Sequence, residues 1–382
     1  MARDTNPLQG RRRILRQAAG AMVAAPFLSL GAVRASADTP RAYSTRAVDL
    51  VKRSLVIDML SPLFNEATPD QFGSPLSDED RKAFLSSGVT CFHNSTSMEG
   101  PTAREDVLGY IAAWSGFVGR NADVFSLVGR AQDIDHAKST GKIAVMIGIQ
   151  SSDHFREPKD VELFYALGQR CSQLTYNTQD LLGSGCTERV DGGLTDYGAS
   201  IVKAMNKVGM LVDLSHCGPQ TTLDGIEAST KPVAITHSNC KALNDHPRCK
   251  SDEAIRKLAA KGGVMGITEV RMFVSAKEPT TVETFVDHID HVAQLVGIEH
   301  VGIGTDSDLR GYDHMSPEVM KAMQASLGKR YGFRAKSDTD GLGHPRRMYD
   351  LTDALIRRGY SDANIQLVLG GNFRRLLGEI LV

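Results

Sequence analysis

The 382-residue chain lacks several features that would place it in common classes of protein. It has no excess of either charge, with a formal net charge of −1, and its basic residues are scattered, which argues against nucleic acid as a partner. None of its six cysteines forms a Cys-x-x-Cys pair, so a structural zinc knuckle is not expected. No Gly-x-Gly-x-x-Gly motif follows the first apolar run, which argues against dinucleotide binding.

Long apolar runs are also missing, apart from a mild one near the N-terminus. The hexapeptide RRRILR at 11–16 fits the twin-arginine export pattern, and the apolar stretch after it, 18–33, is short for a membrane span and is interrupted by Pro26. The tripeptide ASA at 35–37 is a small-x-small cleavage signal. The sequence therefore predicts a cleaved signal peptide over 1–37 and a mature protein in the periplasm or outside the cell, with no membrane span.

The rest of the chain alternates between short apolar runs and helix-like segments. Such segments include 196–208, 252–261 and 282–296, and alternation of this kind favours parallel strands joined by crossover helices. Eight units favour a (β/α)8 TIM-type barrel in one domain over 38–382, in which 310–342 would form an insertion or lid. The eight runs are 54–59, 89–93, 143–149, 171–176, 210–214, 233–236, 263–267 and 300–304.

Polar residues stand where these strands are predicted to end, which is where barrel enzymes place their active sites. His216 and His237 each close an apolar run about twenty residues apart, and Asp306 closes another. Two imidazoles and a carboxylate at one rim predict a zinc site; the alternative is that three unrelated polar residues cap their strands. Also on this rim are Asp58, His93, Gln150, Tyr176, Asn177 and Glu269.

Several longer segments resemble the membrane (renal) dipeptidase family. They are LTYNTQDLLGSGC, GLTDYGASIVKAMNKVGMLVDLSHCG, THSNCKALNDHPRCKSDEAIRKLAAKGGVMGI, VGIGTDSD and GGNFRRLL. The resemblance implies an amidohydrolase-like barrel that cleaves dipeptides with two bridged zinc ions. It further implies that His216 and His237 hold the second zinc, that Asp306 binds the first zinc and transfers protons, and that Arg248 grips the substrate carboxylate. The alternative for Arg248 is a capping or surface role.

The chain departs from the family pattern at the other ligands. Where the family's first strand supplies a histidine and an aspartate, this chain has Leu60 and Pro62, and the bridging glutamate is replaced by Gln150. Tyr176 stands in place of a substrate-contacting histidine. We therefore expect one zinc ion rather than two, held by His216, His237 and Asp306. His93 and His154 are candidate replacement ligands, although structural roles are favoured for both.

The function that follows is an exported zinc-dependent hydrolase acting on the amide bond of a dipeptide or similar small carboxylate. Asp306 and Tyr176 are the candidate catalytic residues, for proton transfer and oxyanion stabilisation, and Tyr176 could instead only pack. Arg248, Asn177 and Gln150 are the candidate substrate-binding residues. The alternatives are a degenerate barrel that binds a small molecule or assists the maturation of another protein, and a metal-free isomerase or lyase. A homodimer is left open. Cys217 and Cys240, which adjoin the rim histidines, are expected to be small buried residues rather than ligands or a disulfide.

Overall fold

The computed structural model describes residues 42–67, 72–328 and 331–381. The predicted signal peptide, 1–37, lies outside the described residues. Within the described ranges, no helix combines the length and the apolar character needed to cross a bilayer.

Eight parallel strands close into a barrel, which confirms the predicted fold. β1 pairs with β2 and with β9, β2 pairs with β4, and the remaining neighbours follow in chain order to β9. The strands are β1 Ile57–Asp58, β2 Cys91–Thr96, β3 Phe125–Leu127, β4 Ile143–Ile149, β5 Gln169–Gln173, β6 Leu211–Asp213, β7 Ala234–Ser238, β8 Val264–Ile267 and β9 Val301–Ile303. Each of the eight predicted runs overlaps one strand of this ring. The additional strand, β3, pairs only with the first residues of β4 and was not predicted, because its three residues form no apolar run.

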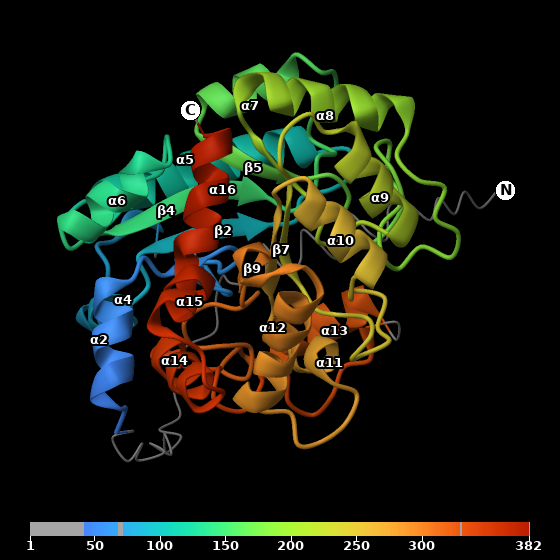
Figure 1. The fold of residues 1–382 in the computed structure, drawn as a ribbon. Coiled ribbons are helices and arrows are strands. Elements are labelled where there is room, and N and C mark those ends of the chain that lie inside the picture. Colours follow the sequence, from blue (N-terminus) through green and yellow to red (C-terminus); the bar gives the residue numbers. More distant parts are fainter. Residues whose placement is uncertain (1–41, 68–71, 329–330, 382) are drawn as a thin grey trace, which may run out of the picture. The chain divides into compact units, whose positions relative to one another are not determined.

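Helices surround the strands, and labelled helices α8, α9, α10 and α12 follow one another around the outside in Figure 1. The helices are α2 Thr45–Arg53, α4 Asp78–Ser86, α5 Ala103–Arg120, α6 Gln132–Ser139, α7 Asp160–Ala166, α8 Asp196–Val208, α9 Pro219–Ala228, α10 Asp252–Ala260, α11 Arg271–Val274, α12 Val282–Val296, η1 Ile298–His300, α13 Pro317–Leu327, α14 Arg347–Arg357, α15 Asp362–Gln366, η3 Leu367–Gly371 and α16 Asn372–Ile380. α13 lies inside the predicted insertion over 310–342.

Local sequence explains the bounds of the crossover helices. At the start of α8 the Thr195 hydroxyl accepts a hydrogen bond from the Gly198 N–H, and the helix ends at Gly209, whose φ of 79° favours glycine. Ser251 caps α10 in the same way, by accepting from the Ala254 N–H. Each helix buries one apolar face against the strands, so caps and periodicity together fix where it begins and ends.

The strands bury side chains on both faces, because helices cover the outside and the barrel interior is filled. Along β4, Val145 and Ile147 belong to the layer between strands and helices, whereas Ala144 and Met146 belong to the interior layer. Phe373 and Leu376 of α16 pack into that interior layer. α16 therefore closes the N-terminal end of the barrel, and the opposite, C-terminal end forms the mouth.

Candidate metal centre and active site

All seven predicted site residues lie at the mouth of the barrel, beyond or at the C-terminal ends of strands. Gln150 follows β4, Tyr176 and Asn177 follow β5, His216 lies just beyond β6, His237 lies in β7, Arg248 lies in the loop between β7 and α10, and Asp306 lies just beyond β9. Gly148 helps to shape the interior below them, because a Cβ added there would lie 1.9 Å from His93 Nε2.

The structure brings the two rim histidines together, with His216 Nε2 and His237 Nε2 2.9 Å apart. The other ring nitrogen of His216, Nδ1, lies 2.8 Å from Asn177 Oδ1. Because an amide oxygen only accepts hydrogen bonds, Nδ1 must carry the proton. The Tyr331 hydroxyl donates to the same oxygen at 2.5 Å. Nε2 of His216 is therefore an unprotonated nitrogen with a lone pair.

The protonation of His237 follows from the Asp213 carboxylate. The Thr236 hydroxyl donates to Asp213 Oδ2 at 2.7 Å, so its oxygen is left to accept from His237 Nδ1 at 2.8 Å. The Ser215 hydroxyl and the Thr236 N–H also donate to Asp213, which holds this chain of contacts in place. With its proton on Nδ1, His237 also presents a lone pair on Nε2.

Two lone pairs that face each other across 2.9 Å repel unless a positive charge lies between them. A proton is disfavoured there, since burial and then the Arg248 guanidinium lower the pKa of both His216 and His237 well below the usual range. A metal ion suits the pair better. Two nitrogens on tetrahedral Zn²⁺ lie about 3.3 Å apart, close to the observed separation, and each imidazole is oriented through Nδ1 as zinc ligands usually are. The histidine pair therefore fits half of a zinc site.

Asp306, the predicted third ligand, lies on the same mouth in an unusual backbone conformation. Its φ is 66°, and its N–H donates to the Leu60 carbonyl at 2.7 Å. Burial raises the pKa of Asp306 to about 7, with Asp58 and Asp213 adding to the rise and Arg248 opposing it. In the described part of the chain, no three His, Cys, Asp or Glu side chains converge as a metal-binding group. Asp306 as a zinc ligand stays a prediction.

Tyr176, one candidate catalytic residue, stacks on the His216 ring with centroids 4.2 Å apart. Burial, followed by the nearby Asp306 carboxylate, raises the pKa of Tyr176, so the phenol keeps its proton and can donate a hydrogen bond. Gln150 is buried, and its Nε2 donates to the Ser95 carbonyl at 3.3 Å. The roles predicted for both residues stay predictions.

Arg248 is fully buried rather than on the surface. Its Nη1 donates to the Ser215 carbonyl at 2.5 Å and its Nη2 to the His237 carbonyl at 3.2 Å, so it ties together the two segments that carry the histidines. Among the described residues, its buried Nε has no hydrogen-bond partner. The side chain thus fixes the two histidine-bearing segments, and its role in binding a substrate carboxylate stays a prediction.

The roles of the two further histidines, His93 and His154, stay predictions. Nδ1 of His93 contacts the Met59 carbonyl at 2.6 Å, while Nε2 of His154 contacts Gln169 Oε1 at 3.1 Å. Among the described residues, Nε2 of His93 is buried without a hydrogen-bond partner, and His93 is close enough to His237 to contribute to the lowered pKa of that ring. Cys217 and Cys240 are free and buried, as expected.

Sequence reasoning missed two residues around the histidines, Tyr331 and Asp213. Tyr331 reaches Asn177 from 154 positions away, and no spacing in the sequence indicates this contact. Asn177 itself was predicted to bind substrate, whereas its Oδ1 is occupied by the His216 and Tyr331 donors. Asp213 carried a weak signal, as a carboxylate at the end of an apolar run, but its partners are apparent only in the fold.

A closed parallel barrel with a histidine pair at its mouth is the architecture of amidohydrolase-like metal-dependent hydrolases. The family model for membrane dipeptidase, peptidase family M19, matches residues 78–326. The chain therefore belongs to the membrane dipeptidase family, which confirms the resemblance noted in its sequence.

Relatives and solved structures agree with this assignment. The chain is 32% identical over 264 residues to dipeptidase verJ of Clonostachys rogersoniana, a match that covers 68% of this chain and 61% of that relative. A crystal structure of an amidohydrolase from Pseudomonas aeruginosa is 30% identical, with a TM-score of 0.76 over 87% of this chain and 98% of that one. A metallopeptidase from Rhodobacter sphaeroides, liganded with a phosphinate mimic of the dipeptide L-Ala-D-Ala, has a TM-score of 0.68 at 17% identity, covering 86% of this chain and 99% of that one. The last match shows the fold alone.

Proposed function

We propose that this protein is an exported hydrolase that cleaves the amide bond of a dipeptide or a similar small carboxylate, using one zinc ion held by His216, His237 and Asp306. Family membership supports a metal-dependent hydrolase. The single observation that carries the proposal is the 2.9 Å separation of the two Nε2 atoms, which the hydrogen bonds at Nδ1 leave without protons. Such a pair needs a cation, and its surroundings oppose a proton.

The ion, when bound, supplies a water of lowered pKa and polarises the scissile carbonyl. The residues of the chain supply the rest. Asp306, beside the ion that it would hold, could take a proton from the attacking water and return it to the leaving amine. Tyr176 keeps its phenolic proton and can donate to the developing oxyanion. Arg248 offers its unpartnered Nε–H to the carboxylate of the substrate.

The number of ions follows from the same residues. Leu60 and Pro62 cannot bind a metal, and the Gln150 amide cannot offset the charge of a second dication. We infer one ion per chain. The twin-arginine pattern at 11–16 supports export of the folded protein, and we propose that 38–382 form its single mature domain.

The test is metal content and dipeptide hydrolysis measured on the same preparations. His216→Ala and His237→Ala should each lose the zinc and the activity while keeping the circular dichroism spectrum of the fold. His154→Ala is the matched control, because it removes another buried imidazole that lies outside the pair. It should lower the melting temperature and leave one zinc in place.

Two results would contradict the proposal. Two tightly held ions per chain would show that other residues rebuild a second metal site. A wild-type protein that binds no transition metal, even after reloading, and hydrolyses no dipeptide would favour the non-hydrolytic alternative, in which the barrel binds a small molecule or assists another exported protein.

A further inference from the structure

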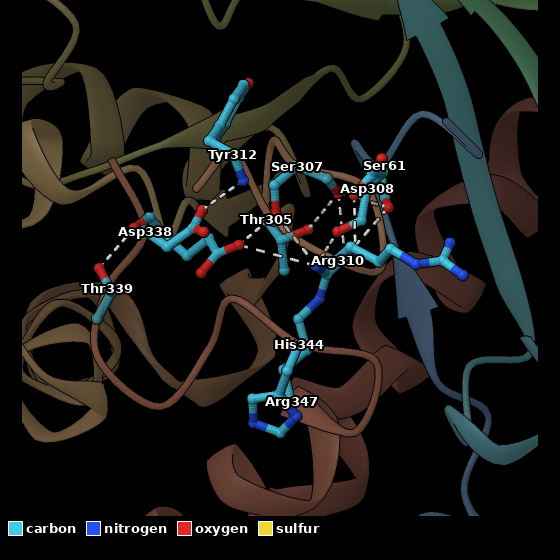
Figure 2. Close-up of polar contacts among 12 residues, drawn as sticks. Ser61, Thr305, Ser307, Asp308, Arg310, Tyr312, Asp338, Thr339, His344 and Arg347 are labelled. Atoms are coloured by element: carbon cyan, nitrogen blue, oxygen red, sulfur yellow. Dashed lines mark hydrogen bonds and ion pairs between the residues drawn. The ribbon is translucent and has the colours of Figure 1, made fainter. Parts of the chain in front are cut away.

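A buried arginine lies on the side of the mouth formed by β1 and β9, whereas the histidine pair lies at β6 and β7. Arg347, the first residue of α14, is 1% exposed. Figure 2 shows its side chain among the labelled residues Ser61, Ser307 and Asp308. These residues come from the segments that follow β1 and β9, whereas Arg347 enters from a distant part of the chain.

The contacts of this guanidinium form a shell of oxygen atoms. Nη2 donates to Asp58 Oδ2 at 3.2 Å and to the Ser61 hydroxyl and the Ser307 carbonyl at 3.1 Å each. Nη1 donates to the Ser307 hydroxyl at 3.1 Å and to the Asp308 carbonyl, and lies 3.7 Å from Glu269 Oε1. Carboxylate, hydroxyl and carbonyl oxygens around one positive charge are the donor set that hard divalent cations use.

Two buried carboxyl groups, Asp58 and Glu269, lie beside the Arg347 guanidinium. Burial raises the pKa of Asp58, and the Arg347 guanidinium opposes that rise, as do hydrogen bonds from Thr305. Burial, then Asp338, raises the pKa of Glu269 to about 8, with Arg347 again opposing. Arg347 Nη2 and Asp58 Oδ2, 3.2 Å apart and both buried, form a pair in which removal of one partner leaves the other group uncompensated.

The oxygen shell also encloses the backbone on both sides of Asp306. Arg347 holds the Ser307 and Asp308 carbonyls directly, and through Asp58 it holds Thr305, whose N–H donates to Asp58 Oδ1 at 2.8 Å. Asp306 between them has a φ of 66°, a conformation that costs free energy for a residue other than glycine. The hydrogen bonds that Arg347 and Asp58 make to the residues before and after Asp306, here called the clamp, stabilise this conformation.

We propose that Arg347 is a resident cation of the barrel mouth, filling an oxygen shell that would otherwise suit a metal ion, and that it is a positioning residue for Asp306. The guanidinium holds these oxygen atoms in place, so this side of the mouth requires no metal ion. The consequence for catalysis rests on the function proposed above, whereas the clamp itself can be measured without any activity.

The first test compares Arg347→Lys, which keeps the charge, with Arg347→Met, which keeps the apolar packing. Arg347→Met should lower the melting temperature by about 4–7 °C and speed amide hydrogen exchange in peptides covering 301–311. Arg347→Lys should recover most of both losses. Arg271→Met is the matched control, because Arg271 is 2% exposed and its guanidinium bonds Glu278, Asp340 and the Asp338 carbonyl rather than any residue of 301–311. It should leave exchange over 301–311 unchanged.

The second test restores the missing cation. In Arg347→Ala, millimolar guanidinium or Mn²⁺ should slow amide exchange over 301–311 again, and Arg271→Ala should show no such response. The proposal is overturned if Arg347→Met is as stable as Arg347→Lys, or if the exchange of 301–311 does not change in Arg347→Met. It also fails if neither cation acts on Arg347→Ala, or if both alanine variants respond alike. Should Arg347→Ala not fold, the comparison of lysine with methionine still decides.

Discussion

The chemistry of individual residues at the mouth depends on which ring nitrogen carries a proton. Asn177 Oδ1 accepts from His216 Nδ1, and Thr236 Oγ1 accepts from His237 Nδ1 because its own hydrogen is given to Asp213. Both imidazoles are thereby held as the tautomer that presents Nε2 to a metal. The two acceptors are as important to the site as the histidines themselves. Rotation of either ring would turn its Nε2 atom away from the other histidine.

Asn177→Ala should weaken zinc binding by about 10–100-fold, because His216 loses the acceptor that fixes its tautomer and orientation. The fold should be little affected. The measurement is zinc affinity by competition with a chelator, alongside a thermal melt. Asn206→Ala is the control. Asn206 is a buried amide near the C-terminal end of α8, and its Oδ1 accepts a hydrogen bond from the Thr230 N–H. It should lower stability without changing zinc affinity. Unchanged affinity in Asn177→Ala would mean that His216 is oriented by other contacts.

At the scale of secondary-structure elements, α16 has a task that differs from that of the crossover helices. It packs Phe373 and Leu376 into the interior layer and so closes the N-terminal end of the barrel. A Cβ added at Gly302 of β9 would lie 2.5 Å from the Phe373 ring, which shows how closely helix and strand approach. The helix therefore contributes to stability, whereas the chemistry lies at the opposite end of the strands.

Phe373→Ala should cost about 3–5 kcal/mol of unfolding free energy, because it leaves a cavity at a fully buried position. Zinc content per folded molecule should stay the same, since the histidine pair lies at the other end of the barrel. Urea unfolding and elemental analysis check the two parts. Leu163→Ala on α7, where the side chain is 43% exposed, should change stability little. Loss of zinc from the folded Phe373→Ala protein would show that the two ends of the barrel are coupled.

For the molecule as a whole, the formal charges nearly cancel, and buried carboxyl groups with shifted pKa values contribute to the pH dependence of stability. Glu269 is fully buried, and its pKa is raised from 4.5 to about 8. Between these values the folded state binds more protons than the unfolded state. This group's contribution to stability is therefore present at low pH and is lost as pH rises towards and through 8.

Glu269→Gln stays neutral at every pH, so it should make the decline in stability between pH 5 and 8 shallower, by at most about 1.4 kcal/mol per pH unit. Urea unfolding of the metal-free protein across this range gives the slope. Glu227→Gln changes an exposed carboxyl on α9 and should leave the slope unchanged. A slope in Glu269→Gln equal to that of the wild type would mean that Glu269 titrates alike in the folded and unfolded states.

The eight strands of the barrel were predictable because they depend on local patterns. Short apolar runs marked every strand of the ring, and the helix-like segments predicted over 196–208 and 282–296 coincide with α8 and α12, Asp196–Val208 and Val282–Val296. The position of His216, His237 and Asp306 at one rim follows from the same logic, since parallel strands all end on the same side. β3 escaped prediction because a strand of three residues has too short a pattern to be recognised.

The tertiary structure alone decided which atoms meet at that rim. The protons on the histidines are placed by Asn177 and Asp213, and the Tyr331 contact with Asn177 joins residues 154 positions apart. The contact between Arg347 and Asp58 spans 289 positions. Composition and spacing report only on near neighbours in the chain, so the amino-acid sequence determined the barrel and the rim on which its polar residues stand. Closure of the barrel brought distant partners within hydrogen-bonding distance, and these partners set the protonation, burial and charge on which the chemistry depends.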